Sequence, residues 1–313
     1  MSHTVDSEES SPEEPDGLTP AAAFSLLGND TRIAILQAML DADAQDSPVP
    51  FSTLYDRVDL DDSGQFNYHL QKLTEHFIRQ TDDGYEFRYA GWKVVRSVFA
   101  GTFNERAQLD PFETDGTCYS CGGTLIASYA NEFLTIECAE CGARHVRHSF
   151  PPGGLDGRSP AELLQAFHHH VRHHYCLAAD GVCPECMGPV TTSLVPGSEE
   201  ILGLDVRVDH VCERCQNWLY FAVGVNLLDT VEVLTFHAER GVDLSTEPFW
   251  QFSWCVSDTH TTVLDTDPMR IRLSIPLDGD ELRVVVAETA DNPVRRIGDD
   301  LAIEHIETRL EVG

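Results

Sequence analysis

The sequence predicts a multidomain α+β protein, and three observations support this fold class. Apolar residues recur with helical spacing before Cys118, the middle of the chain carries four Cys-X-X-Cys pairs, and the last part alternates apolar and polar residues as strands do. With 313 residues, the chain is long enough for two or three domains with separate cores. We therefore expect a helical N-terminal domain, two units that combine cysteine-bearing strands with a helix, and a small β-rich C-terminal layer.

The chain is strongly acidic, with 52 Asp and Glu against 21 Lys and Arg, of which only two are lysines. Its formal charge of −31 would ordinarily argue against a nucleic-acid partner. The acidic excess is spread along the chain, however, and resembles the proteins of salt-loving archaea, in which surface charge preserves solubility in concentrated salt. Residues 63–106 depart from this background, because six bases and five acids give them a net charge of +1.

Residues 1–17 contain six acids, no Lys or Arg, and several Ser and Pro, so we expect a disordered acidic tail. This segment has neither the positive charge nor the apolar run of a secretory signal, and no later stretch is long enough to span a bilayer. We therefore expect a cytoplasmic protein without a membrane partner.

The first predicted domain covers residues 18–107 and begins with three helices. Residues 21–27 form a short apolar helix that ends at Gly28. Asn29 can cap a second helix over residues 30–41, and Ser52 can cap a third helix that ends near Val58.

A fourth helix is expected to begin near Asp62 or Ser63. One face is apolar and should turn to the core: Phe66, Leu70, Leu73 and Phe77. The other face carries amides, a phenol and a lysine, which can bond base edges and phosphates in a major groove: Gln65, Asn67, Tyr68, Gln71 and Lys72. Taken alone, such a face is also compatible with an ordinary solvated helix.

A hairpin follows this helix. Residues 78–80 and 85–89 read as strands, and Asp83-Gly84 between them is a strong turn signal. Arg79 and Arg88 could contact phosphates that flank the helix. The candidate DNA-binding residues are therefore Ser63, Gln65, Asn67, Tyr68, Gln71, Lys72, Arg79 and Arg88.

Three helices, a recognition helix and a hairpin occur in the order of a winged helix-turn-helix. Residues 27–36, together with residues 68–73 and the hairpin, resemble the ArsR-like family of prokaryotic transcriptional regulators. The resemblance covers roughly residues 20–106 and implies a DNA-binding repressor or activator, usually a homodimer. The family's metal sensors carry cysteines in the helix before the recognition helix. Residues 51–60 have none, so that sensing mechanism does not carry over.

Residues 90–106 are expected to form a further helix with a wide apolar stripe that includes Trp92, Val95 and Phe103. By the resemblance, a helix at this position supplies the dimer contact. Packing against the N-terminal domain or the next domain is the alternative.

The eight cysteines of the four pairs are candidate metal ligands: Cys118, Cys121, Cys138, Cys141, Cys183, Cys186, Cys212 and Cys215. Two residues between cysteines let one turn present both thiolates to one ion, and two turns complete a tetrahedral shell. We expect two Zn²⁺ per chain, although four thiolates also suit iron. The alternative is a set of disulfides, which a reducing cytoplasm disfavours. Cys176 and Cys255 remain outside the pattern.

The first zinc-ribbon and helix unit is predicted over residues 115–178, after a linker at residues 108–115. Residues 124–129, 133–136 and 144–150 read as its strands. Ser159 is expected to cap a helix that begins with Pro160 and turns Leu163, Leu164 and Phe167 inward.

Residues 180–245 repeat this plan in a second unit, with a strand at residues 218–223 and a helix near residues 229–240. Residues 150–153 align with residues 221–224, which suggests an internal duplication. The first unit's helix also contains five histidines: His168, His169, His170, His173 and His174. Although two pairs have the i, i+4 spacing of metal ligands, we expect an exposed polar face or packing near the zinc.

Residues 246–313 are predicted to be mostly β, with Phe249, Trp250, Phe252 and Trp254 in the core. Residues 269–275 alternate as a half-buried strand, and Asp278-Gly279 turns the chain into a second strand. The stretch from about residue 291 is too polar to assign.

These features favour a sequence-specific transcription regulator that binds double-stranded DNA as a homodimer. No catalytic set is recognisable, so we expect no enzyme, and closed four-cysteine shells favour structural zinc. One alternative is that the C-terminal region is a protein-interaction or ligand-sensing module and that the N-terminal domain serves mainly as a dimerisation platform. A second alternative is that the C-terminal region is a zinc or redox sensor. A metalloenzyme that uses the histidine helix is least favoured, and it would need a third zinc ion.

Overall fold

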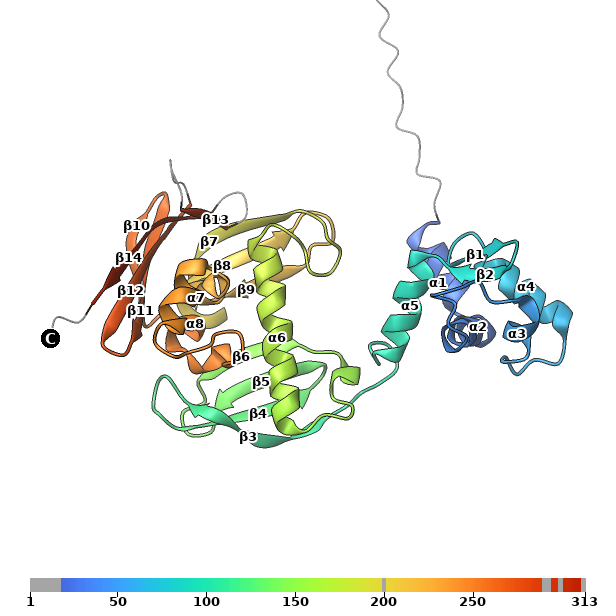
Figure 1. Ribbon diagram of the computed structural model, residues 1–313, viewed down its shortest axis with the longest axis horizontal. Helices are drawn as coiled ribbons and strands as arrows, with labels where there is room; N and C mark the ends of the chain where they lie inside the picture. The colour runs from blue at the N-terminus through green and yellow to red at the C-terminus, as the bar shows by residue number, and fades with distance from the viewer. Residues whose placement is uncertain (1–17, 199–200, 289–293, 298–300, 311–313) are drawn as a thin grey trace, which may run out of the picture. The chain divides into compact units, whose positions relative to one another are not determined.

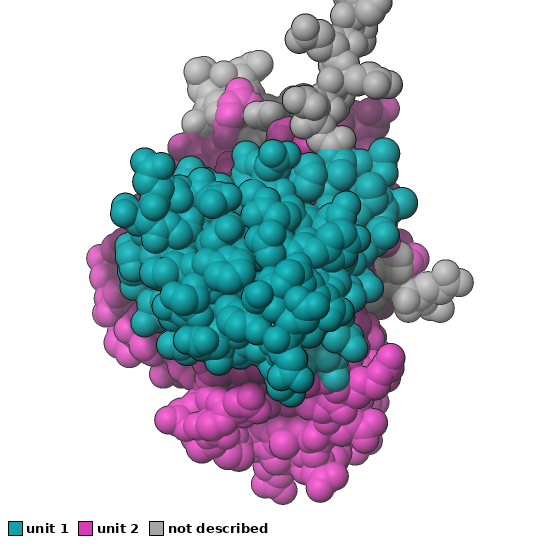
Figure 2. Space-filling model, turned by 90° about the vertical axis from the view of Figure 1, so that its right-hand side faces the viewer, with its two compact units in different colours: residues 1–104 teal, residues 105–313 magenta. Residues whose placement is uncertain are grey.

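A computed structural model describes residues 18–198, 201–288, 294–297 and 301–310. The chain divides into two compact units, residues 1–104 and residues 105–313, which Figure 2 distinguishes by colour. Both units combine helices with strands, so the fold is mixed α and β. The predicted acidic tail, residues 1–17, lies outside the described residues.

The N-terminal unit combines five helices with one hairpin in its described part (Figure 1). Its elements are α1 (Pro20–Leu27), α2 (Asp30–Asp41), α3 (Phe51–Tyr55), α4 (Ser63–Leu73), β1 (Ile78–Thr81), β2 (Gly84–Phe87) and α5 (Tyr89–Phe99). Asn29 Oδ1 accepts a hydrogen bond from the N–H of Arg32 at 3.1 Å, and Asp62 Oδ1 accepts one from the N–H of Gly64 at 2.7 Å. The predicted starts of α2 and α4 are confirmed.

Three predicted helix boundaries in this unit are wrong. Ser52 lies inside α3 instead of capping it, and that helix ends at Tyr55. α4 ends at Leu73, so Phe77 is not on its apolar face, although the ring is buried in the same core. α5 ends at Phe99, well before residue 106. Periodicity identified the buried residues of α4 correctly, but it did not show where the backbone leaves the helix, and of the predicted stripe of α5 it is Val95 that is buried.

The predicted hairpin is confirmed. β1 and β2 pair antiparallel, and Arg79 lies opposite Glu86. Gly84 is needed at the turn because its φ is +147° and an added Cβ would lie 2.3 Å from the carbonyl oxygen of Val49.

The C-terminal unit contains three antiparallel sheets in its described part. The first has the order β3 (Leu109–Thr117), β4 (Thr124–Ala130), β5 (Phe133–Cys138) and β6 (Arg144–Ser149). The second has the order β7 (Val190–Ser198), β8 (Ile201–Cys212) and β9 (Trp218–Phe221). The third has the order β10 (Thr261–Thr266), β11 (Met269–Leu277), β12 (Asp280–Ala287), β14 (Leu301–Arg309) and β13 (Arg295–Ile297).

Helices connect these sheets (Figure 1). The α-helices are α6 (Pro160–Ala179), α7 (Val231–Ala238) and α8 (Ser253–Val256), and the 3-10 helices are η1 (Pro152–Gly154), η2 (Val223–Leu227) and η3 (Phe249–Gln251). We call β4 to β6 with their cysteines the first ribbon, and β7 to β9 with theirs the second ribbon. Each ribbon is followed by a 3-10 helix and then an α-helix, as the predicted duplication requires.

The predicted linker at residues 108–115 is instead strand β3, which pairs with β4. β3 packs the large apolar side chains of Leu109 and Phe112 on the core, whereas Asp110 and Glu113 are exposed. Since the two apolar residues are three positions apart, the alternation of apolar and polar residues that indicates a strand is weak. An edge strand of this kind gains its stability from a neighbour that local sequence does not reveal.

The polar C-terminal stretch that we left unassigned contains β13 and β14. β14 pairs with β12, and it buries Leu301, Ala302 and Ile303 before the pattern becomes polar. Three consecutive buried residues hide the two-residue period by which a strand is recognised in a sequence.

The long helix α6 contacts β6 of the first ribbon, β7 of the second ribbon, and η2, which follows the second ribbon (Figure 1). A capping box fixes its start, in which the N–H of Ser159 donates to the carboxylate of Glu162 at 2.8 Å, as expected from the sequence. Further along, the guanidinium of Arg172 is buried and donates to the carboxylate of Asp229 at 3.1 Å and to the carbonyl oxygen of Leu228 at 3.2 Å.

One hydrophobic core cluster runs through the three regions that we predicted as separate units, residues 115–178, 180–245 and 246–313. The ring centroids of Phe167 and Trp250 are 5.9 Å apart, and Phe249 and Trp254 are also buried there, whereas Phe252 is only partly buried. The two ribbons and the third sheet therefore depend on shared packing.

Candidate metal centres

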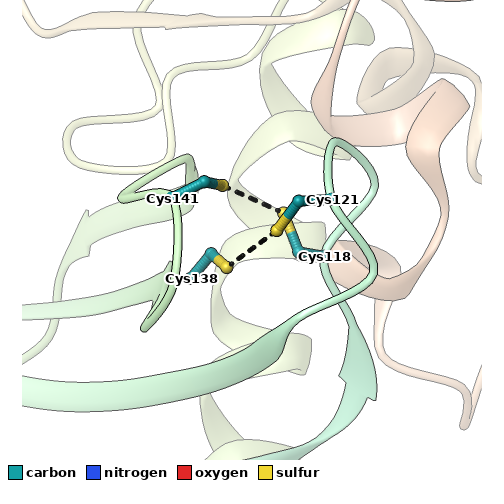
Figure 3. A group of neighbouring side chains, drawn as sticks. All are labelled: Cys118, Cys121, Cys138 and Cys141. Carbon is teal, nitrogen blue, oxygen red and sulfur yellow. Dashed lines mark hydrogen bonds between the residues drawn. The ribbon is translucent and has the colours of Figure 1, made fainter.

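Four cysteines of the first ribbon converge on one point (Figure 3). Each Sγ atom lies within 4.8 Å of the other three. The Sγ atoms of Cys118 and Cys141 are 3.7 Å apart, and those of Cys121 and Cys138 are 3.5 Å apart. The structure thus brings the first predicted ligand set together.

The second ribbon contains a matching cluster. The Sγ atoms of Cys183 and Cys215 are 3.7 Å apart, those of Cys186 and Cys212 are 3.5 Å apart, and all four again lie within 4.8 Å of one another. The segment between the two cysteine pairs is longer in the second ribbon than in the first, because β7 and β8 are longer strands than β4 and β5. This greater length does not alter the arrangement of the four sulfurs.

These sulfur separations fit a metal ion and not disulfides. A disulfide needs about 2.05 Å between sulfurs, whereas four sulfurs at about 2.3 Å from a tetrahedral ion lie about 3.8 Å apart. The structure has all ten cysteines as free thiols. Each cluster is therefore suitable for one tetrahedral ion of its own. Four sulfur ligands would complete the shell of that ion and leave no coordination position for a substrate.

The same backbone turn presents all four cysteine pairs. In the first turn, the N–H of Cys118 donates to the carbonyl oxygen of Gly123 at 2.9 Å, and the N–H of Gly122 donates to that of Cys118 at 2.8 Å. Equivalent bonds begin at Cys138, Cys183 and Cys212. The fourth residue after the first cysteine is left-handed each time: Gly122 (φ 74°), Gly142 (73°), Met187 (60°) and Gln216 (60°).

Each pair combines one buried and one exposed cysteine. Within the second cluster, the N–H of Cys215 points to the sulfur of Cys212 at 3.5 Å. This backbone hydrogen bond is the largest cause that lowers the pKa of Cys212 to about 6. A lowered pKa favours the thiolate, which is the form that binds a metal.

The two remaining cysteines lie outside both clusters. Cys255 is fully buried, and Cys176 is half-buried on α6. Burial is the largest cause that raises the pKa of each thiol, so both stay protonated at neutral pH. Neither has the electropositive, accessible surroundings of a reactive cysteine.

The candidate DNA-binding residues of α4 share an exposed face. Phe66, Leu70 and Leu73 anchor the helix in the core of the N-terminal unit. The exposed side chains are Ser63, Gln65, Asn67, Tyr68, Gln71 and Lys72. Contact between this face and DNA stays a prediction.

Arg79 and Arg88 are exposed, but both have partners. Arg79 forms a cross-strand ion pair with Glu86, and Arg88 donates to the carbonyl oxygen of Glu75. The charge of Arg79 is therefore partly offset at the hairpin.

The histidines of α6 lie in three environments, and of the two expectations, an exposed polar face or packing near the zinc, the exposed face holds for His169 and His173 alone. His168 is buried, and its Nδ1 accepts a hydrogen bond from the N–H of Phe249 at 3.2 Å. His169 and His173 are exposed. His170 and His174 are half-buried.

His170 and His174 face His148 of β6, and one nitrogen of each ring lies within 4.8 Å of one nitrogen of the other two. Burial is the largest cause that lowers the pKa of His148 to about 4 and that of His174 to about 3, so both rings are neutral near pH 7. Sequence reasoning missed His148. The available signal was a histidine in a predicted strand, but its position opposite α6 depends on tertiary packing.

The fold and these clusters define the class of the molecule: a mixed α and β protein with two four-cysteine clusters, each of which could hold a metal ion. The chain belongs to the family described as domain of unknown function DUF7351, whose model matches residues 115–291 and thus more than half of the chain. A second model, domain of unknown function DUF7347, matches residues 20–98. No curated protein and no solved structure matches the chain.

Both four-cysteine clusters, α6 and His148 lie inside the first matched segment. Among the helices that the structure describes, none is both long and apolar enough to cross a membrane.

Proposed function

We propose that this chain is a sequence-specific DNA-binding transcription regulator, with an ArsR-like winged helix-turn-helix in its N-terminal unit and two structural zinc ions in its C-terminal unit. The exposed polar face of α4 is the observation that carries the proposal. α3 precedes this helix and the β1–β2 hairpin follows it, which is the order of recognition helix and wing in that fold.

The side chains of the α4 face support direct reading of bases. Gln71 hydrogen-bonds Tyr85 at the hairpin, and Lys72 Nζ lies 5.6 Å from the ring centroid of Tyr68. These contacts restrict the side chains and so lower the entropy lost on binding. Amides and a lysine ammonium can donate to base-edge acceptors in the major groove.

The charges of the N-terminal unit argue that base contacts matter more than phosphate contacts. Glu86 offsets Arg79 at the hairpin. In addition, the acidic composition is typical of proteins that work in concentrated salt, where the release of counterions contributes little to the affinity for DNA. Specificity would then depend on α4 and on the spacing of two copies.

An apolar groove supports homodimerisation. It has a volume of about 510 Å³ and lies between α1 and α5, where Phe24 and Phe103 are 73% and 71% exposed. A soluble chain gains by covering such rings, and we infer that a second copy does so. Two α4 helices would then reach half-sites about one helical turn of DNA apart.

The dimer is tested by replacing both groove phenylalanines. The variant Phe24→Ser/Phe103→Ser should be monomeric by sedimentation at concentrations where the unchanged chain is dimeric, since both rings are exposed and their loss leaves the core intact. Tyr89→Ser is the matched control, because Tyr89 is also 73% exposed but does not line the groove. An unchanged dimer in the double variant would contradict this surface.

Zinc is the ion that we propose for both clusters. A complete tetrahedral thiolate shell is typical of structural zinc, and each cluster joins two separate Cys-X-X-Cys turns at one end of its ribbon. Iron is the competing ion for four thiolates, and elemental analysis distinguishes the two.

A cleft in the C-terminal unit supports a second candidate function, the sensing of an effector. Its volume is about 300 Å³, and it is lined by both ribbons, including Arg144, Arg147, Trp218 and Tyr220. Two guanidinium groups beside aromatic rings would suit a small anionic ligand. Such binding would regulate the DNA-binding unit and does not compete with the first proposal.

Replacement of the α4 side chains tests the regulator proposal. Gln71→Ala/Lys72→Ala should weaken binding to a selected DNA site about 5–150-fold, since one good base contact contributes about 1–3 kcal/mol. The control Arg106→Ala/Gln108→Ala also removes one positive charge and one amide from exposed positions, but outside α4. Equal DNA affinity of the two variants would contradict α4 as the recognition helix.

A further inference from the structure

A third group of possible metal ligands lies where α6 crosses β6. His148 comes from β6, and His170 and His174 stand one turn apart on the facing side of α6. The ring centroids of His170 and His174 are 4.0 Å apart, and each lies 5.3 Å from that of His148. One ring nitrogen from each residue lies within 4.8 Å of the other two.

Two of these rings are oriented by one backbone carbonyl. The carbonyl oxygen of Ser149 accepts a hydrogen bond from Nδ1 of His148 at 2.9 Å and from Nε2 of His170 at 3.0 Å. Donation from these nitrogens fixes the tautomers, so Nε2 of His148 and Nδ1 of His170 carry lone pairs. A carbonyl that fixes the outer nitrogen of a ligating histidine is typical of metal sites.

The Nε2 atom of His148 is buried and has no hydrogen-bond partner among the described residues. An unpaired buried acceptor costs about 1–3 kcal/mol, so the protein would normally provide a donor. Packing alone explains the ring contacts between these histidines and Tyr175, but it does not explain this nitrogen.

We propose that His148, His170 and His174 bind a third metal ion, a divalent cation such as Zn²⁺, through three imidazole nitrogens. Imidazole suits zinc and neighbouring transition metals, whereas a three-ligand set leaves a fourth position open. This centre therefore differs in kind from the two closed thiolate shells.

The open position gives the third centre a possible link to a ligand. His148 also lines the cleft between the ribbons, together with Ser149 and Tyr175. Because three neutral ligands do not compensate a divalent ion, water or a small anion would complete its shell.

The proposal predicts a third zinc equivalent. Tag-free full-length protein with both cysteine clusters loaded is dialysed against micromolar Zn²⁺, and bound metal is counted per chain. We expect three zinc ions for the unchanged chain and two for His170→Gln/His174→Gln. The matched control His169→Gln/His173→Gln changes an equally spaced, exposed pair on the same helix and should retain three.

Co²⁺ titration of the unchanged chain, with zinc in both cysteine clusters and none at the proposed third centre, gives an independent readout. Binding at the proposed centre should produce weak visible d–d absorption without the strong near-ultraviolet band of thiolate ligands. Co²⁺ should also raise the unfolding temperature of the unchanged chain and not that of His170→Gln/His174→Gln. This comparison remains valid if His148 variants fail to fold.

Three results would each overturn the proposal. The first is only two zinc ions in the unchanged chain, and the second is loss of the third ion in the exposed-pair control. The third is retention of three zinc ions by His170→Gln/His174→Gln.

Discussion

The two ribbons present their cysteines with the same turns but differ in nearly everything around them. Both place four sulfurs within 4.8 Å of one another and use the same pair of backbone hydrogen bonds at each Cys-X-X-Cys turn. The first ribbon is followed by a helix of 20 residues with five histidines, and the second by a helix of 8 residues with one.

The left-handed turn position shows what the cysteine turn requires. The first ribbon has Gly122 and Gly142 there, and the second has Met187 and Gln216 with nearly the same φ. The shared backbone hydrogen bonds of the turn therefore accompany this conformation even where the residue disfavours it. Away from the cysteine turns, the two ribbons differ in the length of their strands and in the helix that follows each.

Loss of one buried ligand is the strongest test of this comparison. Cys138→Ser should lose one ion and Cys212→Ser the other, and each should lower the stability of the C-terminal unit by more than about 3 kcal/mol, since zinc coordination drives the folding of small metal domains. Because both ribbons share one core, each variant should unfold in a single transition at lower temperature. Metal content and calorimetry measure both effects.

Cys176→Ser is the control for these variants, because Cys176 lies outside both clusters. Two separate unfolding transitions in either ligand variant would mean that the ribbons are independent domains.

Breaking the contact between α6 and the segment that follows the second ribbon should lower stability less than the loss of a cysteine ligand does. Arg172→Met removes a buried guanidinium that hydrogen-bonds Asp229 and Leu228, and we expect a loss of about 2–4 kcal/mol with both ions retained. The side chain of Asp229 is 39% exposed, which limits the cost of leaving it unpaired. Denaturant unfolding measures the loss, and Arg158→Met, on an exposed arginine, should be nearly neutral.

Exchanging the turn residues between ribbons should give the smallest effects, with opposite signs. Gly122→Met should destabilise by about 1–2 kcal/mol because a side chain disfavours the left-handed conformation, although the space around Gly122 is open. Met187→Gly should stabilise by less than about 1 kcal/mol, since relief of strain is opposed by a more flexible unfolded chain. Equal effects of the same sign in thermal unfolding would contradict the equivalence of the turns.

The features that could be predicted from the sequence are those set by neighbouring residues. Cysteine spacing identified both ligand sets, and the capping residues Asn29 and Ser159 located helix starts. The edge strand β3 and the strand β14 were missed because their stability comes from β4 and β12. His148 was missed for the same reason, since only the packed structure places it against α6.

Selection of genomic DNA fragments by the purified protein in molar potassium chloride, with metal content determined on the same sample, tests the central claim most directly. Our account predicts enrichment of a short, nearly palindromic site by fully metal-loaded protein, and loss of that enrichment in Gln71→Ala/Lys72→Ala. If no fragment is enriched while the protein is folded and its metal sites are full, the N-terminal unit is not a sequence-specific DNA reader, and the regulator proposal is wrong.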